Sequence, residues 1–372
     1  MAKWLEKTLG EVTAFIAKGI PPKYTEEENE NTIRVLNQKC NRNFEISYNE
    51  SRIHDCEKKK VPVDKMLRAG DVLINSTGTG TAGRVAQMVE VTVPTTIDGH
   101  MILIRPSEEL DPIYYGYAVK SFQSQIEGLA EGSTGQTEIN RRRLQDEVII
   151  RYPSDKLVQK NIGSFLANID EKIKTNKEIN KNLEQQAQAI FDDMFPDIFS
   201  LNTDATLQDL IVFANGKKRP KTIGNIPVYG GNGILAYTDK SNADNCVIIG
   251  RVGAYCGNTF LCLDKCWTSD NAIQAKNRTG SSPLFIYYLL RNASLSSRHI
   301  GTGQPLMTQG ILNAIPIKYP VEEKISAFIE TCSPIHEMIS GNRQQNESLA
   351  SIRDSMLPKL MSGEMDASEL NL

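Results

Sequence analysis

Polar and cationic side chains gather beside glycine-rich turns at several places along this chain of 372 residues. Glycine lets backbone amides approach a phosphate closely, lysine neutralises phosphate, and arginine, asparagine and glutamine can make bidentate contacts with base edges. A single charge run is usually only a solvated face, but here the clusters recur in both halves of the chain. They predict a nucleic-acid surface whose candidate residues are Lys23, Thr79, Arg84, Gln136, Arg141, Lys217, Lys218, Arg219, Asn232, Arg251, Tyr255, Thr302 and Gln304.

One segment has the spacing of a nucleotide-binding loop. Gly78 to Gly83 satisfies G-x-G-x-x-G after an apolar strand, and Asp98 follows downstream. A cofactor site of this kind needs a helix that begins at the last glycine. Arg84 to Val93 is instead rich in β-branched residues and is followed by Pro94, which predicts a strand. We therefore favour a β-turn over a cofactor loop.

Other patterns that are compatible with chemistry have simpler structural explanations. Asp111-Pro112-Ile113-Tyr114 is similar to the Asp-Pro-Pro-Tyr loop of amino-methyltransferases, but the second proline is missing, so we expect a helix that begins at Pro112. The cysteines lack zinc-binding spacing, and the histidines form neither a triad nor a ligand set. We expect no metal site, core thiols at Cys256, Cys262 and Cys266, and structural or surface roles for His54, His100, His299 and His336.

The chain contains an internal repeat. Gly132 to Gln136 returns as Gly301 to Gln304, and a hydrophobic strand ending in Tyr-Pro follows each. Such a duplication predicts two similar binding surfaces related by a pseudo-twofold axis. A molecule of this kind can hold two binding partners at a fixed separation. The other matching pairs are Val148–Pro153 with Ile315–Pro320, Val72–Ile74 with Val247–Ile249, and Thr8-Leu9 with Thr206-Leu207.

Two long stretches show the three-to-four-residue spacing of an amphipathic helix. The first is roughly 40 residues, or ~60 Å at 1.5 Å per residue. The second runs from about Glu322 to Met361, and Pro334 and Pro358 predict a kink or a break in it. No globule can cover either narrow stripe along its whole length, so we favour two helices packed on each other over helices packed only on their own domains. The expected seam residues are Ile162, Leu166, Ile169, Ile173, Leu183, Ile190, Ile339, Leu349, Ile352 and Met356.

The remaining segments predict an α+β fold: two similar mixed α/β domains separated by two long antiparallel α-helices, with a pseudo-twofold internal repeat. The expected parts are residues 1–153, 154–197, 198–320 and 321–372. Each globule should contain only one or two helices, among them Pro112–Glu127 in the first and Pro283–Asn292 in the second. The expected strands are Thr32–Leu36, Asp71–Asn75, Arg84–Val93 and His100–Arg105 in the first globule, and Val228–Tyr229, Cys246–Gly250, Phe260–Leu263 and Ala272–Ala275 in the second.

Bulk composition is that of an ordinary globular chain, with 40% hydrophobic and 23% charged residues and a net charge of -3. That charge argues against a nonspecific polycation but allows local basic patches. The longest apolar run, Leu284 to Leu290, is too short for a membrane span, and the first residues lack the apolar core of a signal peptide. Seven scattered cysteines favour reduced thiols, so a cytoplasmic protein is expected.

The order of globule, long helix, globule and long helix, together with several motifs, strongly resembles the specificity subunit of type I restriction-modification enzymes. The resemblance covers essentially the whole chain and is most specific in the second half. The turn at Gly78 to Gly83 departs from the family's pattern. The segments that carry the resemblance are Gly250–Asn258, Gly301–Pro305, Ile315–Pro320 and Leu357–Glu364.

The resemblance implies that residues 1–153 and 198–320 are target-recognition domains, each reading one half of a split asymmetric site in double-stranded DNA, with the two helices as a ruler. It also implies two modification subunits that methylate adenine with S-adenosylmethionine, and restriction/translocase subunits that use ATP and Mg. This chain would hold no cofactor, and it contains neither a complete methyltransferase motif nor a Walker loop. We expect a noncatalytic DNA-recognition and scaffolding subunit without membrane partners.

Two alternatives come from other classes. An S-adenosylmethionine-dependent methyltransferase would use the Gly78 to Gly83 loop and would bind that cofactor as an isolated chain. A purely structural coiled-coil adaptor would show no sequence preference on DNA.

Overall fold

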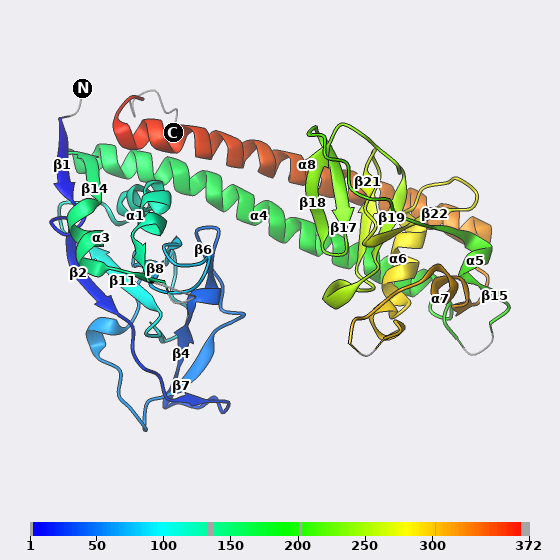
Figure 1. The fold of residues 1–372 in the computed structure, drawn as a ribbon, viewed down its shortest axis with the longest axis horizontal. Coiled ribbons are helices and arrows are strands. Elements are labelled where there is room, and N and C mark those ends of the chain that lie inside the picture. Colours follow the sequence, from blue (N-terminus) through cyan, green and yellow to red (C-terminus); the bar gives the residue numbers. More distant parts are fainter. Residues whose placement is uncertain (1–2, 133–136, 201–202, 302, 366–372) are drawn as a thin grey trace. The chain divides into compact units, whose positions relative to one another are not determined.

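The computed structural model describes residues 3–132, 137–200, 203–301 and 303–365. The chain forms two compact units: unit 1 comprises residues 1–175 and 345–372, and unit 2 comprises residues 176–344. Two long helices, α4 (Lys156–Met194) and α8 (Glu322–Ser362), each contribute one part to unit 1 and the other part to unit 2 (Figure 1).

Unit 1 contains two four-stranded sheets, ordered β2-β11-β8-β9 and β10-β4-β7-β3. The strands of the first, which is antiparallel, are β2 (Thr13–Lys18), β8 (Val72–Asn75), β9 (Val85–Gln87) and β11 (Met101–Pro106). Those of the second are β3 (Tyr24–Thr25), β4 (Thr32–Leu36), β7 (Arg52–Asp55) and β10 (Thr95–Ile97), with β4 and β10 parallel. Short pairs join β1 (Trp4–Thr8) to β14 (Ile149–Pro153), β5 (Asn41–Arg42) to β6 (Glu45–Ile46), and β12 (Ala130–Glu131) to β13 (Glu138–Ile139).

Three short helices accompany these sheets: α1 (Pro112–Ser121), α2 (Gln123–Gly128) and α3 (Arg141–Glu147). The Asp111 carboxylate accepts bonds of 3.0 Å from the N–H groups of Ile113 and Tyr114, which confirms the helix start at Pro112. The expectation of only one or two helices, one of which reaches Glu127, is wrong, because α1 ends at Ser121 and is followed by α2 and α3.

Unit 2 contains a four-stranded sheet ordered β16-β22-β19-β20 and a three-stranded sheet ordered β18-β17-β21. The strands are β16 (Ile211–Asn215), β17 (Ile226–Gly230), β18 (Gly233–Thr238), β19 (Cys246–Gly250), β20 (Thr259–Cys262), β21 (Trp267–Thr268) and β22 (Ala272–Asn277). A short pair joins β15 (Ala205–Thr206) to β23 (Pro316–Ile317), and the helices are α5 (Leu207–Leu210), α6 (Leu284–Asn292) and α7 (Gln309–Asn313).

The mixture of sheets and helices makes both units α+β, as expected from the sequence. One expected strand is much shorter than predicted. Only Val85–Gln87 of the segment Arg84–Val93 is a strand, and Val89 is 83% exposed. The β-branched composition predicted an extended segment, but only its first residues pair with strand β8.

The two units share a set of backbone contacts. The Gly83 N–H bonds the Asn75 carbonyl at 2.9 Å, and the Gly257 N–H bonds the Gly250 carbonyl at the same distance. This matches β8 and β9 of unit 1 with β19 and β20 of unit 2. Three further bonds from an N–H to a carbonyl repeat in the same way. Leu9 to Val148 in unit 1 corresponds to Leu207 to Ile315 in unit 2, Ser76 to His100 corresponds to Arg251 to Asn271, and Ile139 to Ser76 corresponds to Met307 to Arg251.

Each unit also has one matched crossing where only glycine fits. A Cβ atom at Gly19 would lie 2.0 Å from the Asp98 carbonyl oxygen, and one at Gly216 would lie 1.9 Å from that of Ser269. Contacts this short are impossible for any side chain. In both units, therefore, the glycine that follows the edge strand, β2 or β16, lies against the backbone just before the neighbouring strand, β11 or β22.

Helix α8 continues through Pro334 and Pro358, so a break at either proline is wrong, whereas a kink stays a prediction. An interior proline removes one helical hydrogen bond and costs ~3 kcal/mol, but packing can outweigh that cost. Cys332 and Leu360 on the same helix are fully buried, each close to one of the two prolines.

Within each unit, segments of α4 and α8 share the globule's core. Ile162 and Leu166 belong to one cluster with Leu357 and Leu360 in unit 1. In unit 2 the corresponding cluster includes Phe191 of α4 and Phe328 of α8. The helices therefore pack both on each other and on the adjacent sheets.

Candidate nucleic-acid interface

Four loops of unit 2 lie together at one end of its sheets, and we call them the unit 2 rim: residues 216–219, 231–232, 251–258 and 269–271. Backbone hydrogen bonds connect these loops to one another or to the strand residues next to them, from Lys217 N to Thr268 O (3.0 Å), from Arg251 N to Asn271 O (3.0 Å), and from Ser269 N to Tyr229 O (2.9 Å). Because the main chain makes these connections, most of the rim's polar side chains are left to face solvent or a ligand, whereas Cys256 and Ser269 are buried.

Gln304 lies beside the turn that contains Arg251 and Tyr255. The Met307 N–H bonds the Arg251 carbonyl at 2.8 Å, and the Gly253 N–H bonds the Pro305 carbonyl at 2.9 Å. Tyr255 is 48% exposed and Gln304 is exposed. Arg251 is half-buried, and its Nε finds no acceptor within the described part of the chain. A desolvated donor is costly when it lacks a partner, so Arg251 suits an interaction with an external acceptor.

Lys217, Lys218 and Arg219 form an exposed basic loop on this rim. None of these three cations forms an ion pair with a described carboxylate, whereas Lys276 and Arg343 of the same unit pair with Asp244 and Glu184. The side chain of Asn232, at the tip of the β17–β18 hairpin, is also exposed. The structure thus brings seven sequence-predicted residues to one end of unit 2: Lys217, Lys218, Arg219, Asn232, Arg251, Tyr255 and Gln304.

Unit 1 has a matching set of loops, the unit 1 rim: residues 19–20, 76–84, 98–100 and 137–139. Thr79 is exposed here, and half-buried Arg84 donates from Nη2 to the Gly80 carbonyl at 3.0 Å. Lys23 is exposed just before β3, and its N–H bonds His54 Nδ1 at 2.8 Å, which ties it to the second sheet. Gln136 of unit 1 and Thr302 of unit 2 lie outside the described residues.

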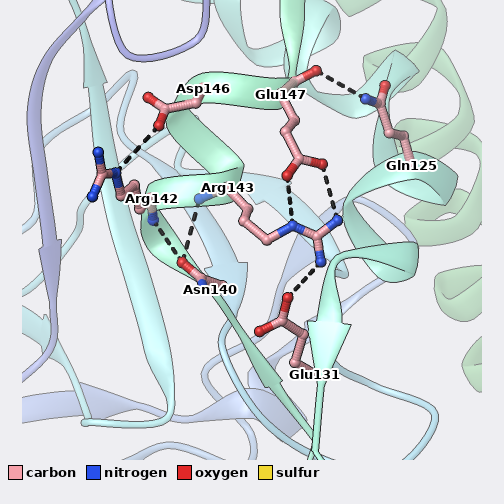
Figure 2. A network of polar contacts seen from close by, with 7 residues as sticks. All are labelled: Gln125, Glu131, Asn140, Arg142, Arg143, Asp146 and Glu147. Atoms are coloured by element: carbon pink, nitrogen blue, oxygen red, sulfur yellow. Dashed lines mark hydrogen bonds and ion pairs between the residues drawn. The ribbon is translucent and has the colours of Figure 1, made fainter.

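Most of the arginine run 141–143 is engaged within the protein (Figure 2). Arg143 pairs with Glu131 and Glu147 at 2.5 Å each, and Arg142 lies 3.5 Å from Asp146. Arg141 is exposed, and no carboxylate among the described residues pairs with it. Arg141, which has no such pair in the described ranges, and Arg142, whose side chain is 90% exposed, are therefore better able than Arg143 to contact a ligand.

Sequence reasoning missed Asn258 and Asn271, which are exposed on the unit 2 rim. The Gly250 N–H bonds the Asn258 carbonyl at 2.7 Å, just as the Asn75 N–H bonds the Arg84 carbonyl at 3.0 Å. Asn258 therefore occupies the place of Arg84 in the other unit. An alignment of the two halves on their glycine turns could have revealed it.

The G-x-G-x-x-G segment is a hairpin turn, as the sequence analysis favoured. Gly78, Gly80 and Gly83 have φ angles of 112°, 69° and 87°, which suit glycine, and Gly83 leads into strand β9 two residues later. No helix follows to bind a cofactor phosphate, so the methyltransferase alternative is not favoured.

The predicted seam residues differ in burial. Ile162, Leu166, Ile169, Ile173 and Ile339 are at most 8% exposed, whereas Leu183, Ile190, Leu349 and Met356 are half-buried. Ile352 is 45% exposed and lies outside any buried seam. The reason is its neighbour: Arg353 turns inward to pair with Asp170, and successive helix residues point about 100° apart.

In each unit a tyrosine of a globule helix bonds a residue of a long helix. Tyr117 donates to Asp170 at 2.6 Å in unit 1, and Tyr288 bonds His336 Nε2 at 2.9 Å in unit 2. Burial, followed by nearby Arg343 and Arg291, lowers the pKa of His336 to about 4. Burial also lowers the pKa of Lys120, which lies 4.0 Å from Asp170, to about 8.

The cysteines are free thiols, and Cys256, Cys262 and Cys266 are buried, which confirms them as core residues. Within the described ranges, no group of three or more histidine, cysteine, aspartate or glutamate side chains could hold a metal ion. None of the helices in those ranges is long and apolar enough to cross a membrane.

The family model for the type I restriction modification DNA specificity domain matches residues 1–185 and 203–346. The chain belongs to this family. Among solved structures it is similar to the type I restriction-modification S subunit from M. genitalium, with a TM-score of 0.59 at 18% identity over 97% of this chain and 96% of that one. The HsdS subunit from Thermoanaerobacter tengcongensis matches at 14% identity and a TM-score of 0.37, over 97% of both chains. No curated protein sequence matches.

Proposed function

We propose that this specificity-family chain is the noncatalytic subunit that selects DNA for a type I restriction-modification complex. Each unit would present its rim to one half of a bipartite, asymmetric site in double-stranded DNA. The recognition domains would be residues 1–153 and 198–320, connected by antiparallel helices 154–197 and 321–372 that act as a ruler. Support comes from the shared backbone contacts, which give both units a rim at the same strand ends.

The single observation that carries this proposal is the unit 2 rim, where backbone bonds hold an exposed basic loop beside Arg251 and Asn232. Lysines on such a surface neutralise phosphates, while arginine and asparagine can recognise guanine and adenine edges in the major groove. The duplication would place two such surfaces on one molecule, as a split site requires.

We further propose that two modification subunits and, where present, restriction/translocase subunits assemble on this chain and supply S-adenosylmethionine, ATP and Mg chemistry. The complex would work in the cytoplasm, consistent with the seven free thiols of this chain.

The test is to map methylated adenines in cells that express the modification subunit with and without this chain. The expected result is methylation at one two-part sequence with a fixed spacer, and only when this chain is present. Identical methylation without it would refute the assignment. A one-part motif would refute only the bipartite proposal.

A further inference from the structure

The two units differ in how they cover one edge of the main sheet. In unit 1 the edge strand is β9, and the β5–β6 hairpin lies along it through a parallel bridge between Phe44 and Ala86. The hairpin comes from residues 37–51, which connect β4 to β7. In unit 2 the matching strands β17 and β18 are joined by the tight turn at 231–232, so unit 2 has no such hairpin.

Strand β20 is the edge strand that corresponds to β9. The register pairs Leu73 with Ala86 in unit 1 and Ile248 with Phe260 in unit 2, so Phe260 matches Ala86. The Gly250 N–H bonds the Asn258 carbonyl. Because an antiparallel ladder alternates, the main-chain groups of Thr259 and Leu261 must then face away from β19. No hydrogen bond to them from outside the ladder is found among the described residues.

A groove of about 360 Å³ lies along this open edge. Its walls include Gly257 to Phe260, the α6 residues Tyr287 and Arg291, Ser294 to Ser296, and Glu184 of α4. All of these residues belong to unit 2. The groove therefore has a strand edge on one side and a cation on the other.

The hairpin of unit 1 indicates what such a groove accepts. Its tip residue Phe44 packs against the Tyr117 ring at 5.2 Å, and the Lys120 ammonium lies 4.2 Å from the Phe44 ring centre. The next residue, Glu45, also raises the pKa of Lys120, but less than Asp170 and Asp354 do. An aromatic ring thus lies over the cation of α1, and a carboxylate follows that ring in the sequence.

Arg291 holds the place of Lys120 in unit 2. Each cation is near the end of its helix, and each lies over the matching tyrosine, Lys120 at 5.5 Å from Tyr117 and Arg291 at 5.8 Å from Tyr288. Arg291 is exposed, and no carboxylate in the described ranges forms an ion pair with it. Glu184 in the groove wall pairs with Arg343 instead, at 2.9 Å.

We propose that this groove binds an extended segment of a modification subunit, which adds to the edge of β20 and places an aromatic residue followed by a carboxylate against Arg291. The segment would do for unit 2 what residues 37–51 do for unit 1. Strand addition supplies main-chain hydrogen bonds, and the groove's cation supplies the selectivity. The inference rests on the proposed function for the existence of modification subunits, and it adds the surface and the chemistry of their contact.

The first experiment compares assembly of the full chain with co-expressed modification subunit, measured by copurification and by titration of the purified subunits. Arg291→Glu should weaken assembly at least tenfold through charge reversal. Thr259→Pro should do the same by removing an outward N–H without breaking the β19 ladder. The control, charge reversal of the exposed Lys240 by Lys240→Glu, should leave assembly unchanged. Wild-type affinity in both groove variants, with folding verified by circular dichroism, would overturn the inference.

The second experiment fills the groove from within. Residues 37–51 replace the turn at 231–232, so that the chain's own hairpin covers β20. The grafted chain should lose partner affinity by a similar factor, and a synthetic peptide of residues 37–51 should compete with the modification subunit on the wild-type chain. Full assembly by a folded graft would overturn the inference. If even the wild-type chain fails to bind the modification subunit, the proposed function fails instead.

Discussion

The basic loop of the unit 2 rim offers the most quantitative test of DNA binding. Each phosphate contact that a protein makes contributes about 0.9 to the slope of log affinity against log salt. If Lys217, Lys218 and Arg219 each neutralise one phosphate, replacing all three with alanine lowers that slope by about 2.7. Between 50 and 200 mM salt, the variant's affinity should therefore fall about 40-fold less than that of the wild type.

The assay is fluorescence anisotropy of the assembled complex on its mapped site, titrated at several salt concentrations. A matched control removes the same charge from the opposite strand ends of unit 2, with Lys240→Ala, Lys265→Ala and Lys276→Ala. Lys276 pairs with Asp244 at the surface, so its loss costs little stability. The control should keep the wild-type slope. An unchanged slope in the folded loop variant, or an equal decrease in the control, would show that this loop does not contact DNA.

Three further predictions follow from the same geometry. Arg251→Ala should lower discrimination at one position of one half-site by about 1 to 3 kcal/mol while the other half-site is read normally, and methylation mapping that shows equal loss in both halves would contradict base contact. His336 is held neutral in the fold because its pKa is lowered to about 4, whereas the unfolded chain protonates near 6.5. Stability should thus be complete above pH 6.5 and decrease toward pH 4, by up to about 3 kcal/mol, and urea unfolding of His336→Gln should lack that share of the loss. Four residues inserted after Asn176 lengthen α4 by ~6 Å, close to two base pairs, so methylation should shift to a spacer longer by one or two base pairs, whereas a two-residue insertion, which turns the domain by about half a turn, should be much worse. An active four-residue variant that keeps the original spacer would exclude the ruler.

Local chemistry predicted several elements well. β-branched residues after Gly83 marked the turn as a hairpin, and Asp111 with Pro112 marked a helix start that the structure contains. Other features depend on partners that are distant in sequence. Arg143 is neutralised by Glu131, and Ile352 is exposed because its neighbour Arg353 pairs with Asp170. Periodicity places a residue on a helix face only to within one position, so it could not decide between Ile352 and Arg353.

Proline content was misleading for a similar reason. The hydrogen bond lost at Pro334 can be inferred from the local sequence. The burial of Cys332 and Phe328, which favours a continuous α8, depends on tertiary packing that the local sequence does not reveal. The equivalence of Asn258 and Arg84 was also missed, since it requires an alignment of the two halves on their glycine turns, and the backbone bonds of those turns confirm it.

The glycine crossings at Gly19 and Gly216 have a consequence for how such a protein can diversify. The frame of each rim is built from main-chain bonds and from one position that admits no side chain. Exposed neighbours such as Lys218 and Asn232 are not needed to hold that frame together. If the rims read DNA as proposed, new preferences can arise by exchanging side chains on either rim while its framework stays fixed. One rim could then change its target while the other keeps the old one.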